Sequence, residues 1–159
     1  MTHALEPDLE AGSLDSATMH DLFTLAVRLY THQMYPQSAR VMQFLLRHDP
    51  ARPHYHRALG KAFHAQGQHE QALQAYARAV KLGMPDADVH FYIGQCLIFM
   101  RRYDLAAQAL ERCMALARSG PQAGDALLQR ARMLFDRVQV MASRAARAVN
   151  PPVLSKETR

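Results

Sequence analysis

Residues 53–86 read PHYHRALGKAFHAQGQHEQALQAYARAVKLGMPD, and residues 87–120 read ADVHFYIGQCLIFMRRYDLAAQALERCMALARSG. Aligned without a gap, the two stretches repeat with a period of about 34 residues, and this register places Gly60 on Gly94. Small residues recur where two helices must approach closely, and large apolar residues recur where they fill the space between helices. The same register continues backwards into residues 19–52.

This register resembles the tetratricopeptide pattern, in which small residues and large apolar residues alternate at fixed places along a pair of helices. The sequence therefore predicts an all-α fold of three tandem tetratricopeptide repeats over residues 19–52, 53–86 and 87–120. The fourth position, often Trp in this pattern, is Leu or His here, and Leu45 replaces a small residue. The first repeat matches least well, as is typical of terminal repeats.

Proline and glycine mark the ends of the expected helices. Pro36 and Pro53 stand where a helix begins and the missing N–H is tolerated, and Gly67 stands where a positive φ ends a helix. The helices are expected near residues 19–33, 36–48, 53–66, 69–82, 86–101, 103–118 and 122–148.

The flanking segments follow from the same reading. A stack of repeats leaves an open apolar face at its end, so the amphipathic stretch within residues 121–148 is expected to be a capping helix. We expect residues 1–18 to be a partly flexible N-terminal segment that can act as a dimerisation element. Residues 149–159 are expected to be a flexible tail, because Pro151 and Pro152 end the helix.

The charge of the chain is uneven. The net charge is +5, and residues 112–159 hold nine Lys and Arg against three Asp and Glu. Such a basic segment suits an acidic partner or nucleic acid, but aromatic residues do not interleave with the arginines, so nucleic-acid binding is not favoured. A solvated outer face of the cap explains the arginines without a ligand.

The sequence favours a cytosolic protein. No apolar run approaches the roughly 18 residues that a membrane span needs. Residues 1–18 hold four acidic residues and neither Lys nor Arg, unlike a secretory signal.

Motifs for catalysis and metal binding are missing from the sequence. No glycine-rich phosphate loop, GxSxG motif or pair of acids on an apolar face occurs, so we expect no enzyme activity and no cofactor. Cys96 and Cys113 have no CxxC or Cys/His zinc spacing and are interpreted as free buried thiols. His64 and His69 lie on either side of the Gly67 turn, and no HExxH motif exists. The sequence therefore predicts no metal site.

The first helix of each repeat lines the concave inner face of such a stack. Exposed aromatic side chains there can anchor a peptide, and a basic middle suits acidic residues or a free carboxylate. The alternative is that the N-terminal segment or a second copy of the chain covers this face. The predicted peptide-binding groove comprises Phe23, Val27, Tyr30, Arg57, Lys61, His64, Phe91, Gln95 and Ile98.

Two stretches go beyond a generic repeat. The first is Leu22-Phe23-Thr24-Leu25-Ala26, and the second is Val89-His90-Phe91-Tyr92-Ile93-Gly94-Gln95-Cys96. With three repeats and a cap, they resemble the class II type III secretion chaperones of the SycD/LcrH/IpgC family. The resemblance covers residues 19–120 well and the cap loosely.

The resemblance implies a bacterial cytosolic chaperone. Members hold an extended segment of a hydrophobic translocator protein in the concave groove, which prevents aggregation and premature association before export. By matched position, Phe23, Val27, Tyr30 and Phe91 would line the pockets. Many members form homodimers through N-terminal segments, and some act with a transcription factor.

Two features differ from the family. The pI of about 9.6 is unusual among these generally acidic chaperones, and Arg57 and Lys61 stand where smaller or apolar residues would be expected.

Two other functions stay open: a needle-subunit co-chaperone, and a repeat scaffold that regulates transcription together with a transcription factor.

Overall fold

The computed structural model describes residues 14–119 and 125–149. Within these ranges the chain forms seven α-helices and no strand, so the predicted all-α repeat fold is confirmed. The predictions for most of the N-terminal segment and of the tail lie outside the described residues. The helices are α1 (Ser16–Thr31), α2 (Tyr35–His48), α3 (Pro53–Ala65), α4 (His69–Lys81), α5 (Ala87–Phe99), α6 (Tyr103–Ser119) and α7 (Asp125–Val149).

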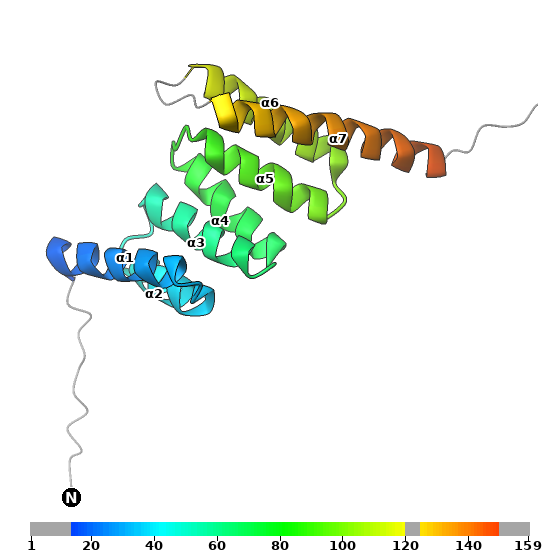
Figure 1. Ribbon diagram of the computed structural model, residues 1–159. Coiled ribbons are helices and arrows are strands. Elements are labelled where there is room, and N and C mark those ends of the chain that lie inside the picture. The colour runs from blue at the N-terminus through cyan, green and yellow to red at the C-terminus, as the bar shows by residue number, and fades with distance from the viewer. Residues whose placement is uncertain (1–13, 120–124, 150–159) are drawn as a thin grey trace, which may run out of the picture.

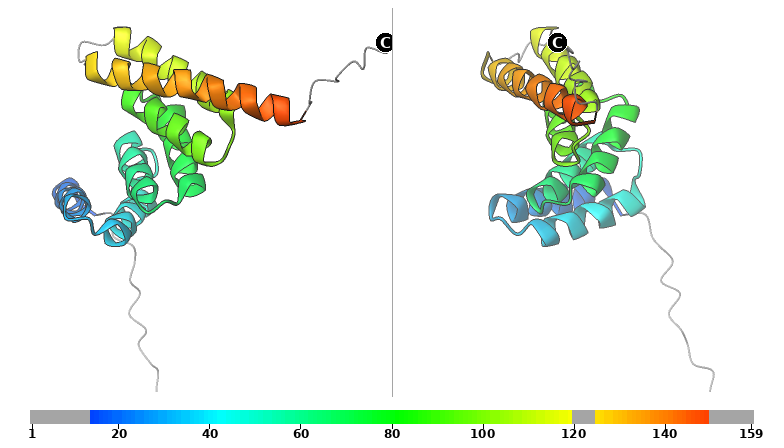
Figure 2. Two further views of the ribbon diagram at one scale, coloured as in Figure 1. Left: turned by 45° about the vertical axis from the view of Figure 1, so that its right-hand side comes forward. Right: turned by 90° about the vertical axis from the view of Figure 1, so that its right-hand side faces the viewer.

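The helices stack in chain order. Figure 1 shows α1 and α2 at one end of the stack and α6 and α7 at the other. Each repeat is a helix pair, α1 with α2, α3 with α4 and α5 with α6, and α7 packs along α6. Figure 2 shows the same order from two further sides. The chain is therefore an open stack whose inner face is lined by the first helix of each pair.

Small residues allow the two helices of a pair to touch. A Cβ added to Gly60 of α3 would lie 2.5 Å from the ring of Tyr76 on α4, and one added to Gly94 would lie 2.9 Å from Leu110. The first repeat has Ala26 in this register, and the buried Ser38 hydroxyl donates a 2.8 Å hydrogen bond to the Ala26 carbonyl. The recurring small residues thus have a direct steric cause.

The turn within each repeat is also repeated. Gln33, Gly67 and Arg101 stand at the same register, and all three have positive φ, of 61°, 73° and 58°. The residue after each donates a backbone hydrogen bond of 2.8–3.0 Å to the carbonyl five residues earlier. This bond closes the first helix of the repeat in the same way each time, with a left-handed residue at its end.

Helix ends differ from the sequence-based bounds by a few residues. α1 begins at Ser16, three residues before the expected start at residue 19, because the Asp15 carboxylate accepts a 2.8 Å hydrogen bond from the Thr18 amide. This is a helix N-cap. α5 ends at Phe99, before the expected end at residue 101, because Arg101 takes the left-handed conformation.

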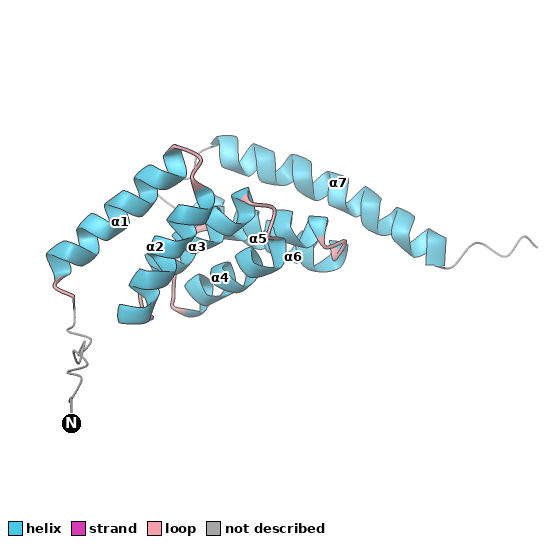
Figure 3. Ribbon diagram, turned by 90° about the horizontal axis from the view of Figure 1, so that it is seen from below, coloured by secondary structure: helices cyan, strands magenta, loops and turns pink. Residues whose placement is uncertain are grey.

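The C-terminal helix covers the third repeat. Ala131 and Val138 of α7 are fully buried against the side chains of α5 and α6, and Leu134 packs beside them. Met133 and Val140 of the same helix are exposed to solvent. Figure 3 shows α1 and α7 at opposite ends of the molecule, with α3 and α5 between them.

Candidate peptide-binding groove

Nine side chains were predicted to line the groove, and helical spacing explains their common direction. On α1, Phe23, Val27 and Tyr30 lie four and then three residues apart, so they share one side of the helix. The same spacing holds for the trio on α3 and for the trio on α5. Each trio of candidate residues therefore lies on one side of the first helix of its repeat.

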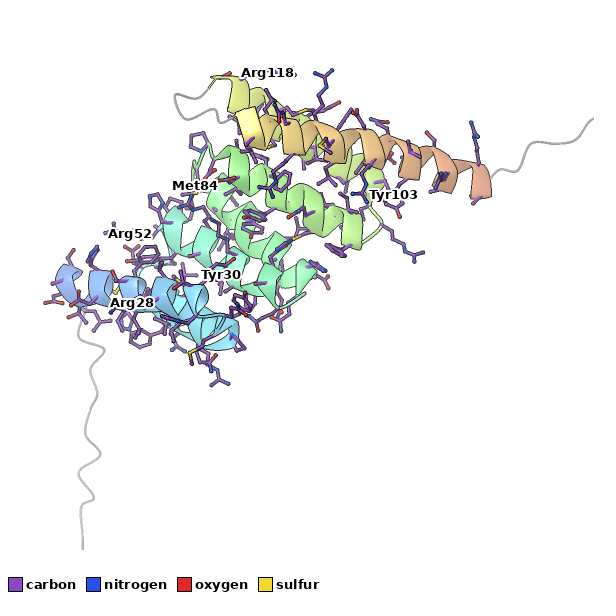
Figure 4. The ribbon with its side chains drawn as sticks, viewed as in Figure 1. Arg28, Tyr30, Arg52, Met84, Tyr103 and Arg118 are labelled. Carbon is purple, nitrogen blue, oxygen red and sulfur yellow. The ribbon has the colours of Figure 1, made fainter. Side chains whose placement is uncertain are left out.

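A pocket of about 210 Å³ lies between α1 and α3. We call it the α1–α3 pocket. It brings together five of the nine predicted residues, and Figure 4 shows Tyr30 where α1 approaches the second repeat. Its walls are Phe23, Ala26, Val27, Tyr30, Ser38, Met42, His54, Arg57, Ala58 and Lys61.

A second, wider pocket of about 520 Å³ adjoins the first near the start of α1 and α3. Phe23, His54 and Arg57 line both pockets, so the two form one continuous concave surface. The Phe23 ring is held against Tyr55 with ring centres 5.4 Å apart. This contact gives the aromatic wall between the two pockets a defined position.

The positive charge of the groove is smaller than the sequence indicates. Arg57 Nη1 lies 2.6 Å from an oxygen of Asp86, and the two side chains keep only 34% and 22% of their exposure. The pair neutralises Arg57, so the basic middle that the sequence predicts is weaker than expected. Lys61 Nζ lies 5.6 Å from the centre of the Tyr92 ring, in cation–π range. Lys61 is therefore the main positive charge of the α1–α3 pocket.

The phenol groups along the groove stay neutral. Burial is the largest cause that raises the pKa of Tyr30, and it also raises the pKa of Tyr92. Tyr30 is half-buried, with its ring 5.3 Å from that of Tyr35. Because the Tyr30 phenol is neutral, its hydroxyl can donate or accept a hydrogen bond.

The third repeat differs from the prediction. Phe91 was expected to be exposed in the groove, but it is only 3% exposed and belongs to the core formed with α6 and α7. The Arg130 guanidinium of α7 lies 4.9 Å from the centre of its ring. The expectation of an exposed anchor at Phe91 is therefore wrong, because the cap covers that face of α5. Gln95 and Ile98 are half-buried, and neither lines the α1–α3 pocket.

His64 is directed toward the neighbouring repeat. Its ring centre lies 5.3 Å from that of Tyr92 and 5.6 Å from that of His69. Burial, followed by the charge of His69, lowers the pKa of His64, so the ring is neutral at neutral pH.

Sequence reasoning missed Asp86, which pairs with Arg57, and Tyr92, whose ring lies beside Lys61. Asp86 is the N-cap residue of α5, and one oxygen of its carboxylate accepts a 2.9 Å hydrogen bond from the Asp88 amide. Its second oxygen accepts a hydrogen bond from Arg57 on α3. The 29-residue separation of Arg57 and Asp86 corresponds to no helix spacing, so only the register of the stacked repeats could have indicated the pair.

The helices described by the structure include none that is both long and apolar enough to cross a membrane. The family model for the tetratricopeptide repeat matches the chain over residues 23–87 and 65–112.

Solved structures share the fold. PcrH of Pseudomonas aeruginosa, in complex with the chaperone-binding region of PopD, is 25% identical, with a TM-score of 0.77 over 81% of this chain and 96% of PcrH. SycD of Yersinia enterocolitica, a type III secretion chaperone solved in complex with a peptide of the translocator YopD, is 21% identical, with a TM-score of 0.75 over 80% of this chain and 97% of SycD. A further structure of SycD, an alternative dimer, is 21% identical, with a TM-score of 0.74 over 80% of this chain and 96% of SycD. The resemblance to type III secretion chaperones is confirmed at the level of structure.

Proposed function

Because this chain belongs to the tetratricopeptide repeat family, we propose that it acts as a chaperone of type III secretion and holds an extended segment of a hydrophobic translocator protein. The α1–α3 pocket is the observation that carries this proposal. It combines aromatic and aliphatic walls with one cation on a face that the helix pairs leave open. A surface of this kind suits a peptide with apolar anchors.

The chemistry of the pocket suggests how a client segment binds. An apolar client side chain enters between Phe23, Val27 and Tyr30, and each such side chain contributes about 1.5–3 kcal/mol when fully buried. Lys61 and the Tyr30 hydroxyl then meet polar groups beside the anchor. A few anchors give a moderate affinity, which export machinery can reverse.

Holding a client requires no chemical step. A translocator carries membrane-inserting segments, so we propose that the chain covers such a protein in the bacterial cytoplasm and prevents aggregation and early association. The complexes of PcrH with a region of PopD and of SycD with a peptide of YopD support this proposal.

The organisation of the chain is part of the proposal. Three repeats over residues 19–120 form the binding scaffold, and the helix within residues 121–148 closes its end. Self-association is also proposed, since α1 presents Val27 to solvent on the side that lines the α1–α3 pocket. A dimer that uses this surface would compete with the client for Val27.

Co-expression tests the proposal. The hydrophobic translocators encoded in the same gene cluster should become soluble, and co-purify with the chain, when both are produced together. Joint replacement Phe23→Ala and Tyr30→Ala should return them to the insoluble fraction, while Leu25→Ala, on another side of α1, should not. Translocators that stay insoluble with the unchanged chain, or that stay soluble with the double variant, would contradict the proposal.

A further inference from the structure

Three metal-ligating side chains meet at the junction of the second and third repeats. His64 comes from the end of α3, His69 from the start of α4, and Cys96 from the middle of α5. One ligand atom of each lies within 4.8 Å of the other two. The two histidines face each other across the turn between α3 and α4, whereas Cys96 is distant in sequence and joins them through the stacking of the repeats.

One nitrogen of each imidazole lacks a hydrogen-bond partner among the described residues. Within the described part of the chain, His64 Nε2 and His69 Nδ1 are buried and have no hydrogen-bond partner. Buried polar atoms are nearly always hydrogen-bonded, and an unsatisfied one costs about 1–3 kcal/mol. Two such nitrogens beside one thiol indicate a shared partner that satisfies them together.

We propose that His64, His69 and Cys96 bind one transition-metal ion of the zinc class. Two imidazole nitrogens and one thiolate form a borderline-soft ligand set, which favours Zn²⁺ over Mg²⁺ or Ca²⁺. Three protein ligands leave a fourth position of the tetrahedron for water. This site is independent of the α1–α3 pocket, which none of the three residues lines.

The geometry needs only a small contraction. Zinc bonds of about 2.0–2.3 Å place tetrahedral ligand atoms roughly 3.3–3.8 Å apart, against the 4.8 Å within which the three atoms now lie. Rotation of the side chains can close this difference. Each imidazole also packs against an aromatic ring: His69 stacks on Phe99 with ring centres 4.1 Å apart, and the His64 ring contacts that of Tyr92.

The protonation of the ligands is compatible with metal binding. The lowered pKa of His64 leaves its ring neutral, which is the form that binds a metal. Burial raises the pKa of the Cys96 thiol to about 11, so the bound ion must displace the thiol proton. Because the ligands come from three helices, a bound ion would link the two repeats and stabilise the folded chain.

The test uses the full chain, freed of metal and of any affinity tag. Calorimetric titration should show that one Zn²⁺ ion binds per chain. Thermal unfolding should show that bound Zn²⁺ raises the melting temperature of the chain. Co²⁺ should produce the thiolate-to-cobalt charge-transfer absorption of a cysteine ligand. Loss of a residue that only hydrogen-bonds a metal ligand weakens metal binding about ten- to hundredfold. His69→Gln removes a ligand itself, so it should weaken Zn²⁺ binding at least as much.

Matched controls separate this site from other groups. Cys113 is also fully buried, with a thiol pKa likewise raised to about 11, so Cys113→Ser should keep the cobalt absorption and Cys96→Ser should abolish it. His32, exposed at the end of α1, provides the histidine control His32→Gln. The proposal fails if Zn²⁺ does not bind, which is the result that a water molecule bridging the two rings would give. It also fails if Co²⁺ binds without thiolate absorption. It also fails if His69→Gln binds Zn²⁺ as tightly as His32→Gln, a result that does not depend on the folding of the cysteine variants.

Discussion

Gly60 and Tyr76 illustrate how single residues define the repeat. Tyr76 is fully buried, and its ring occupies the space that a side chain at Gly60 would need. The corresponding pair in the third repeat is Gly94 with Leu110, whose side chain is more adaptable than an aromatic ring. Loss of the small residue should therefore cost most in the second repeat.

The substitution Gly60→Ala tests this packing. Overpacking costs about 1–3 kcal/mol, and the better helix propensity of Ala returns up to about 1 kcal/mol. Because the clash is with a rigid ring, we expect the free energy of unfolding to fall by about 1–2 kcal/mol. Urea unfolding measures it, with Gly94→Ala as the milder control. Unchanged or increased stability for Gly60→Ala would show that the close approach does not constrain the repeat.

Individual residues also show where sequence reasoning ends. The period and the helical spacing were sufficient to place Phe23, Val27, Tyr30, Arg57 and Lys61 in one pocket. They could not show that α7 covers Phe91, because a cap contacts its repeat at no fixed sequence distance. The cluster of His64, His69 and Cys96 likewise matches no sequence motif, because only the stacking of the repeats brings Cys96 to the two histidines.

At the scale of the element, the turns of the three repeats share one backbone conformation but differ in sequence. Only the second repeat uses glycine, Gly67, whereas Gln33 and Arg101 accept positive φ. The positive φ of Gly67 at a helix end was predicted from sequence. The two other left-handed residues were not, because their side chains give no local signal of this conformation.

Exchanges at this turn have opposite expected effects. In the described chain a Cβ at Gly67 meets no atom within 4 Å, so Gly67→Ala carries only the backbone cost of the left-handed conformation. We expect a loss of about 1 kcal/mol of stability. Arg101→Gly relieves the same cost and should be neutral or slightly stabilising, since the flexibility of glycine in the unfolded chain offsets part of the gain. Thermal unfolding compares them. Equal losses for both variants would mean that the turn conformation is not the cause.

At the scale of the whole molecule, the cap decides whether the stack ends in solvent or in a closed core. Val138 of α7 is 1% exposed, whereas Val140 on the same helix is 51% exposed. The amphipathic pattern predicted this helix from sequence, since its apolar stripe has helical spacing. Its position on α6 follows from the exposed end of the third repeat.

The pair Val138→Asp and Val140→Asp tests the cap. An unpaired carboxylate at the buried position should cost about 3–5 kcal/mol. The same change at the exposed position should stay within about 0.5 kcal/mol. Denaturant unfolding followed by circular dichroism measures both values. Similar effects of the two substitutions would contradict a packed cap.

The whole stack could be predicted because each repeat must bury its apolar side against the next, and a period reveals this need. The shape of the groove could not, because it depends on contacts between repeats, such as the ion pair of Arg57 with Asp86. The sequence of a client cannot be predicted from this chain either, because pockets select an extended segment and no sequence motif of the chain encodes it.

The central claim is that the α1–α3 pocket binds an extended translocator segment, and calorimetric titration with peptides that tile a translocator tests it most directly. We expect one segment to bind each chain with about micromolar affinity. Joint replacement Phe23→Ala and Tyr30→Ala should weaken binding at least about a hundredfold, since two anchors each contribute about 2 kcal/mol, while Leu25→Ala should leave the affinity unchanged. Equal affinity of the double variant and the unchanged chain, or no binding by any peptide, would contradict it.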